Sequence, residues 1–194
     1  MPHERMFHHH HAHKLDDPDR ERLLPSAGVV ARLDLRPGLH VADVGAGTAY
    51  FALPIARAVV PGGRVFAVDM QPEMLEHLRG KLTDEPIALV HGSADATTLA
   101  GASVDLVFLA NVWHEIDDRP AALAEAKRVL RPGGRVAIVD WNPVDASETD
   151  PPGPPAAHRL PAAQAVSDLR AAGLAASDPQ AVGPHHYMVI ASMN

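Results

Sequence analysis

Short apolar runs alternate with helix-length amphipathic segments through the middle of this chain, and this alternation constrains its fold most. The apolar runs are His40–Val44, Val65–Val68, Ile87–Val90, Val104–Ala110 and Val136–Val139. The helices expected between and after them are Tyr50–Val60, Pro72–Lys81, Pro120–Leu130 and Ala162–Ala172. Strands that alternate with helices of this length build a parallel sheet with helices on both faces. The pattern therefore predicts a doubly wound α/β sandwich.

The charge balance and the lack of cysteine exclude several classes of function. The 194 residues include 17 Lys and Arg against 24 Asp and Glu, a formal net charge of −7. Because nucleic acids and anionic membranes bind basic surfaces, we expect neither as a partner. Without cysteine there is no thiolate nucleophile or thiolate zinc site. No apolar run approaches the roughly 18 residues of a membrane span, and the first residues lack a signal-peptide core, so we expect a cytoplasmic protein.

A glycine turn follows the first apolar run. Residues 41–50, VADVGAGTAY, combine a strand end, a Gly-x-Gly turn and a helix start, which lets the backbone approach a nucleotide closely. Two features disfavour a dinucleotide: Tyr50 stands where a third glycine would, and Asp43 would repel a pyrophosphate. S-adenosylmethionine has no phosphate and carries an ammonium and a sulfonium, so the turn suits this cofactor better. A nicotinamide-dependent oxidoreductase, or a turn that only packs strand on helix, remains an alternative.

Four segments, in order, resemble motifs of class I S-adenosylmethionine-dependent methyltransferases. These segments are Asp43–Thr48, Val65–Met70, Ser103–Ile116 and Leu130–Arg135. The chain is similar to small bacterial members, loosely like the ubiquinone/menaquinone biosynthesis methyltransferases, most strongly over residues 38–142. The resemblance implies an enzyme with a Rossmann-like, mostly parallel sheet of seven strands in the order 3-2-1-4-5-7-6, one of them antiparallel. Ala49 stands where the family commonly has a third glycine, and we expect alanine to cost little there.

The resemblance also implies which residues bind S-adenosylmethionine. The glycine turn would line the methionine and ribose portions, and Asp69 would accept hydrogen bonds from both ribose hydroxyls. Met70 and Asp95 would contact the adenine, and Asn111 the methionyl part. The full implied set is Asp43, Gly45, Ala46, Gly47, Asp69, Met70, Ala94, Asp95 and Asn111.

His114 is the candidate catalytic residue. It belongs to the segment Asn111–Glu115, which leaves the fourth strand at the switch point of the sheet, where a methyl acceptor must lie. Its ordinary pKa is near neutrality, so it could remove a proton from a hydroxyl or an acidic carbon of a small-molecule acceptor. Trp113 could form a wall of that site or belong to the core. An equally good interpretation is that His114 caps or packs the following helix, and adjacent positions on a helix argue against a direct pair with Glu115.

The chain is expected to form one domain, residues 1–194, in four parts. These are a His-rich N-terminal cap segment (1–37), a cofactor-binding core (38–142), a Pro-rich loop (143–161), and a C-terminal helix and hairpin (162–194). We expect the cap segment and the loop to cover the site, because neither has the periodicity of a core element. Histidines 8–11 and 13 invite a metal, but a terminal tract seldom supplies fixed ligand geometry, so we expect no metal. A non-catalytic protein that binds a ligand or metal on this fold remains a second alternative.

Overall fold

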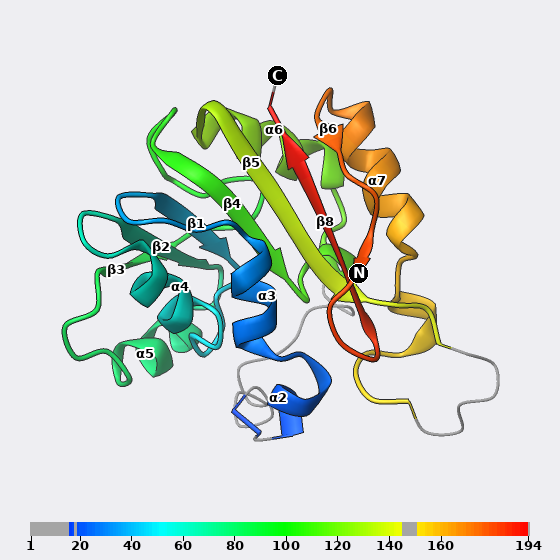
Figure 1. Ribbon diagram of the computed structural model, residues 1–194, viewed down its shortest axis with the longest axis horizontal. Coiled ribbons are helices and arrows are strands. Elements are labelled where there is room, and N and C mark those ends of the chain that lie inside the picture. Colours follow the sequence, from blue (N-terminus) through cyan, green and yellow to red (C-terminus); the bar gives the residue numbers. More distant parts are fainter. Residues whose placement is uncertain (1–15, 18, 145–150, 194) are drawn as a thin grey trace.

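The structure is a computed structural model that describes residues 16–17, 19–144 and 151–193. One sheet runs through it in the order β3-β2-β1-β4-β5-β8-β6, with β7 pairing on β8 (Figure 1). The strands are β1 His40–Val44, β2 Arg64–Asp69, β3 Ile87–His91, β4 Val104–Ala110, β5 Leu130–Trp141, β6 Ala175–Ala176, β7 Gln180–Ala181 and β8 His186–Ser192. β1 to β5 are parallel, and β8 is antiparallel to β5. The predicted fold and strand order are confirmed, with one additional strand.

The sheet differs from the sequence prediction in two places. The first strand of the expected C-terminal hairpin is divided into two short strands, β6 and β7, that both pair with β8, because Pro179 between them has no amide N–H for the ladder. The fifth strand is also longer than the apolar run Val136–Val139, because β5 already begins at Leu130. The pairing of β5 with β4 shifts there, since Val104 pairs with Leu130 and Leu106 already pairs with Arg135.

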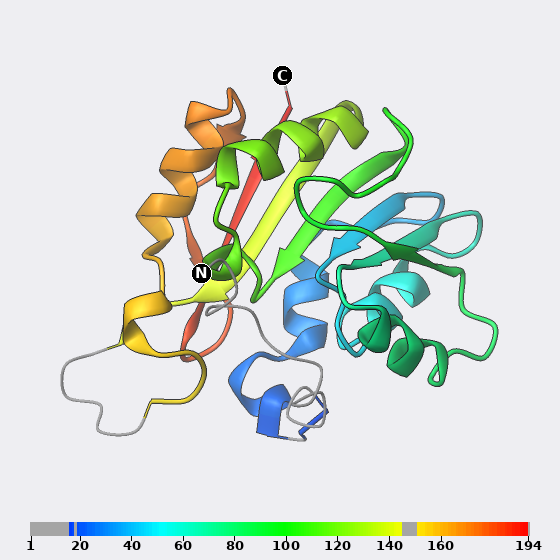
Figure 2. The ribbon, with the colours of Figure 1, turned by 180° about the vertical axis from the view of Figure 1, so that it is seen from behind.

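Helices cover both faces of the sheet (Figures 1 and 2). On one face lie α3 Ser26–Arg32, α4 Ala52–Val59 and α5 Pro72–Arg79; on the other lie α6 Arg119–Val129 and α7 Ala162–Ala171. α4 shows why: its buried side chains, Ala52, Ile55, Ala56 and Val59, recur at helical spacing and form one apolar face. Each face has its own apolar core, one around Phe108 and one around Leu123 and Leu169.

The connections after β1 and β4 leave the sheet toward opposite faces, α4 on one side and α6 on the other. The chain therefore turns in opposite directions after the carboxyl ends of these neighbouring strands. Open α/β sheets bind ligands in the crevice at such a point. The short helix α2 (Asp19–Leu23) lies near this end in Figure 1, as do the 3₁₀ helices η2 (Trp113–Glu115) and η3 (Ala156–His158). The N-terminal histidines lie outside the described residues. Among the helices described, none is long and apolar enough to cross a membrane.

Candidate active site

The glycine turn folds back from β1 and packs against the segment that follows β4. Gly45 and Gly47 have positive φ angles of 74° and 51°, and a Cβ at Gly45 would lie 2.3 Å from Cγ2 of Val112. The amides of Gly45 and Ala46 donate to the carbonyl of Val68 at 2.8 and 3.1 Å. Glycine is therefore required at position 45 both by the backbone conformation and by the close approach of Val112.

Ala49, the departure from the family pattern, also has a left-handed backbone. Its φ angle is 72° and its side chain is fully buried. An L residue in this conformation costs about 1–2 kcal/mol relative to the right-handed region. The expectation that alanine costs little here is therefore wrong, and the turn is held in this conformation by its surroundings.

Asp69 holds the turn in place. The residue is 6% exposed, and its carboxylate accepts the backbone N–H of Gly47 at Oδ2 and that of Gln71 at Oδ1, both at 2.9 Å. Burial raises the pKa of Asp69, and the amide hydrogen bonds act against this rise. Each carboxylate oxygen can accept a second hydrogen bond. The side chain therefore fits the implied contact with two ribose hydroxyls.

Three buried polar atoms beside the turn have no hydrogen-bond partner within the described ranges: Asp43 Oδ2, Thr48 Oγ1 and Asn111 Oδ1. Burial, and next the charge of Asp69, raise the pKa of Asp43 to about 7, while Arg20 lowers it. Buried polar groups normally have partners, so such a cluster suits a ligand that brings donors and positive charge. The ammonium, sulfonium and hydroxyl groups of S-adenosylmethionine fit this set.

The implied adenine contacts lie at the carboxyl ends of β2 and β3. Asp69 pairs with His91 across these strands, and the Gly92 amide donates to the Asp69 carbonyl at 3.1 Å. Met70 is 46% exposed, and the exposed Asp95 accepts a hydrogen bond from the Ser93 hydroxyl. Ala94 is half-buried between them in sequence. The structure thus places this group next to Asp69 but on the outer edge of the site.

The segment before α3 contacts the glycine turn through residues that the sequence did not single out. The guanidinium of Arg20 lies 4.0 Å from the centre of the Tyr50 ring. The Tyr50 hydroxyl lies 2.5 Å from Oε2 of Glu21 and 2.6 Å from the carbonyl of Leu24. The only available signal was Tyr50 itself, an aromatic residue where a glycine would serve a dinucleotide. No periodicity marks Arg20 or Glu21.

His114 and Asp140 form a buried pair at the other side of the switch point. The residues are 4% and 1% exposed. Asp140 Oδ1 lies 2.7 Å from Nδ1 of His114, and Oδ2 accepts the backbone N–H of His114 at 2.8 Å. Burial alone would lower the pKa of His114, but the hydrogen bond and charge of Asp140, with the charge of Glu115, outweigh it and raise that pKa. Asp140 was missed, although it follows the run Val136–Val139 as Asp69 follows Val65–Val68.

The structure also places the two neighbours of His114, Glu115 and Trp113. Oε1 of Glu115 lies 3.8 Å from Nε2 of His114, too far for a hydrogen bond but close enough for an electrostatic contact, because the 3₁₀ turn η2 brings adjacent side chains together. Trp113 is fully buried in the core beneath α6 and α7. It therefore belongs to the core and forms no wall of the site.

A second aromatic residue, Trp141, is the last residue of β5 and, next to Asp140 on the same strand, points to the opposite face of the sheet from Asp140. It pairs with His186 of β8, with ring centres 4.0 Å apart, and the guanidinium of Arg159 lies 5.1 Å from the Trp141 ring centre. His186 is 1% exposed, and burial lowers its pKa to about 3.

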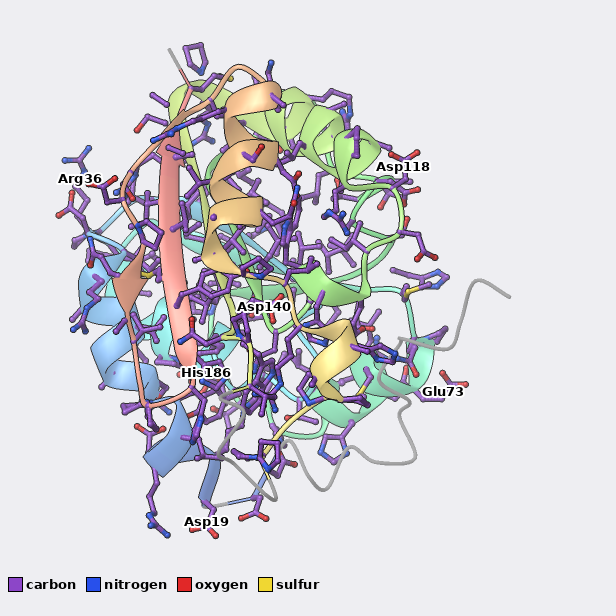
Figure 3. The ribbon with its side chains drawn as sticks, turned by 90° about the vertical axis from the view of Figure 1, so that its right-hand side faces the viewer. Asp19, Arg36, Glu73, Asp118, Asp140 and His186 are labelled. Carbon is purple, nitrogen blue, oxygen red and sulfur yellow. The ribbon has the colours of Figure 1, made fainter. Side chains whose placement is uncertain are left out.

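Figure 3 shows Asp140 and His186 inside the molecule, whereas Arg36, Glu73 and Asp118 lie at its periphery.

Known proteins resemble this chain in sequence and in structure. A methyltransferase domain family matches residues 42–138, half of the chain. The chain is 46% identical over 107 residues to an uncharacterized methyltransferase of Mycobacterium tuberculosis. It is 33% identical over 120 residues to the ubiquinone/menaquinone biosynthesis C-methyltransferase of Burkholderia vietnamiensis. These matches cover 55% and 61% of the chain but 41% and 49% of the relatives, so the chain spans less than half the length of either.

The structural match is more extensive. A crystal structure of an S-adenosylmethionine-dependent methyltransferase from Aquifex aeolicus covers 97% of this chain, and the match spans 100% of that chain, with a TM-score of 0.89 and 28% identity. Together with the glycine turn at the switch point, these matches select one of the functional classes that the sequence left open. The chain belongs to the methyltransferase domain family and has the fold of an S-adenosylmethionine-dependent methyltransferase.

Proposed function

We propose that the enzyme methylates a small molecule with an acidic hydroxyl or carbon, and that His114 removes the proton. The observation that carries this proposal is the buried pair of His114 with Asp140 at the carboxyl ends of β4 and β5. Because a carboxylate only accepts hydrogen bonds, Nδ1 of His114 donates to Asp140, and Nε2 is the basic atom. Bound S-adenosylmethionine supplies a methyl group activated by its sulfonium. The chain's own part is to align the acceptor and to take its proton.

The surroundings of His114 suit a base with a pKa above its ordinary value. Asp140 and Glu115 stabilise the charged imidazolium, so the proton is held well once it is taken. The same rise means that more His114 is already protonated at neutral pH. We therefore expect turnover to increase with pH through an apparent pKa above the usual 6.5 of histidine.

The acceptor is proposed to lie between His114 and the face of Trp141 and His186. The guanidinium of Arg159 lies over the Trp141 ring, and its charge acts to lower the pKa of both His114 and His186. Its guanidinium donates to the carbonyls of Pro152, Pro154 and Asn142 and so shapes the described part of the Pro-rich loop. This loop and the cap segment would exclude water during transfer. The net charge of −7 supports a small molecule rather than a nucleic acid as acceptor.

The test begins with formation of S-adenosylhomocysteine in the presence of a panel of phenols, hydroquinones and enolisable ketones. For an acceptor found in this panel, His114→Gln should lower kcat about 100-fold or more, since general bases contribute roughly 10²–10⁴. Affinity for S-adenosylhomocysteine should stay within about twofold, because His114 acts on the acceptor. His40→Gln is the matched control: His40 begins β1 at the opposite end of the sheet and should keep wild-type turnover.

Wild-type turnover in His114→Gln would contradict the proposal and would assign transfer to alignment alone. If both variants lost activity equally, the loss would reflect stability rather than base catalysis.

A further inference from the structure

The methionine portion of the cofactor is a zwitterion, so a site that recognises it needs a cation as well as an anion. Asp43, two residues before Gly45, supplies a buried carboxyl group. In the part of the chain that the structure describes, two cationic side chains contact residues of the turn, Lys81 and Arg20. Lys81 Nζ donates to the carbonyl of Thr48 at 2.9 Å and to Asp16 Oδ1 at 2.6 Å. Lys81 therefore serves to hold the cap segment and α5 against the turn.

Arg20 occupies a different position. Its guanidinium lies over the ring of Tyr50, 4.0 Å from the ring centre. The side chain is half-buried, and burial lowers its pKa to about 10. The charge of Asp43 acts to raise that pKa, and Arg20 lowers the pKa of Asp43 in return. Each of the two opposite charges therefore stabilises the other. A guanidinium is well suited to a carboxylate, because it can donate two parallel hydrogen bonds.

We propose that Arg20 binds the carboxylate of the methionine portion of S-adenosylmethionine, while Asp43 and Asn111 face its ammonium group. The proposal concerns the cofactor only and does not depend on the acceptor or on His114. A cation and an anion beside the same turn match a zwitterion and give no advantage to a ligand that lacks the amino-acid group.

This assignment gives helix α2 a role in closing the site. α2 carries Arg20, and its neighbours Glu21 and Leu24 bind the Tyr50 hydroxyl. The end of α2 also lies close to the loop between β7 and β8, because a Cβ at Gly183 would lie 2.3 Å from the Leu23 carbonyl. Binding of the carboxylate by Arg20 would therefore hold α2 against the cofactor.

The experiment compares two ligands by calorimetry on the full chain. S-adenosylhomocysteine has the amino-acid portion, whereas methylthioadenosine has the same adenosine and thioether without it. Arg20→Gln should weaken the binding of S-adenosylhomocysteine at least about tenfold, because a charge-assisted bidentate contact is lost. It should weaken the binding of methylthioadenosine less than about twofold. The matched control is Arg22→Gln on the same helix, whose side chain is 83% exposed and pairs only with Asp19 among the residues described. It should change neither affinity.

Three outcomes would overturn the proposal. Equal losses for both ligands would show that Arg20 acts through the folding of α2. Unchanged binding of S-adenosylhomocysteine would show that its carboxylate is held elsewhere. A selective loss in Lys81→Gln but not in Arg20→Gln would move the carboxylate to Lys81. Because both ligands are titrated into the same preparation of each variant, misfolding would weaken the binding of both and would not produce a loss for one ligand alone.

Discussion

Asp43 and Asp140 are both buried carboxyl groups at the ends of central strands, 2% and 1% exposed, but their surroundings differ. Asp140 accepts hydrogen bonds from the His114 ring and from the amides of His114 and Trp141. Asp43 leaves Oδ2 without a partner in the described residues, and its pKa rises to about 7. The side proposed to bind the acceptor is thus assembled before a ligand binds, whereas the side proposed to bind the cofactor keeps a group that its ligand must complement. Substitutions on the two sides should therefore have different effects.

The largest effect is expected for Asp140→Asn. The amide cannot hold the imidazole in the tautomer that leaves Nε2 basic, so kcat should fall about 100-fold or more. Because Asp140 raises the pKa of His114, its removal should also move the acid limb of the pH–rate profile to lower pH. Affinity for S-adenosylhomocysteine should stay within about twofold, since Asp140 lies on the acceptor side.

The pH profile separates positioning from simple structural support. A fall in kcat without a displaced limb would mean that Asp140 only stabilises η2. A large loss of cofactor affinity would remove the distinction between the two sides.

The second-largest effect is expected in the affinity for the cofactor rather than in turnover. Asp69→Ala should weaken S-adenosylhomocysteine by about 1.5–3 kcal/mol, the range for charge-assisted hydrogen bonds. The amide of Gly47 would lose its partner as well, which adds to the loss. At saturating cofactor, kcat should change little. Asp95→Asn is the comparison, since this exposed side chain should cost less than about 1 kcal/mol. Equal affinities for wild type and Asp69→Ala would mean that the ribose is held elsewhere.

The cofactor side was more predictable from sequence than the acceptor side, and the reason is locality. β1 with its glycine turn and Asp69 at the end of β2 are marked by consecutive residues: an apolar run, then a glycine pair or an acid. The pair of His114 with Asp140 joins positions 26 residues apart. It exists only because the register of β4 and β5 brings Ala110 beside Val139. A sequence pattern could mark each residue but not their contact.

The cap segment was the least predictable part. Its contacts depend on tertiary structure, such as the stacking of Arg20 on Tyr50, and α2 buries no residue of its own. Trp113 was ambiguous for a related reason: a large aromatic residue after a strand suits a core and a binding site equally well. Its full burial decides for the core.

The third prediction concerns the stability of the protein without ligand. The pKa of Asp43 is about 7 in the folded state and near 3.8 when exposed, so between these pH values the folded state binds more protons and stability falls as pH rises. Asp43→Asn removes this penalty. We expect a gain of about 2 kcal/mol above pH 7 and little gain near pH 4, measured by urea unfolding. The same variant should weaken S-adenosylhomocysteine, because the ammonium loses its anion.

The dependence on pH is the decisive part of that measurement. An equal gain at pH 4 and pH 8 would assign it to packing of the amide, and Asp43 would then resemble Asp140 in needing nothing from the ligand.

The smallest effect is expected for Tyr50→Phe, which tests how the cap segment is held on the cofactor side. Phenylalanine keeps the ring under Arg20 and removes only the hydroxyl that contacts Glu21 and Leu24. A hydrogen bond of this kind contributes about 1 kcal/mol, and local opening would release it without unfolding the sheet. Amide exchange in α2 should therefore be about fivefold faster, with β1 and β4 unchanged. Faster exchange throughout the sheet would make the hydroxyl a support of the whole fold. Unchanged exchange in α2 would show that the bonds of Asp16 to Lys81 and His77 are enough to hold the segment in place.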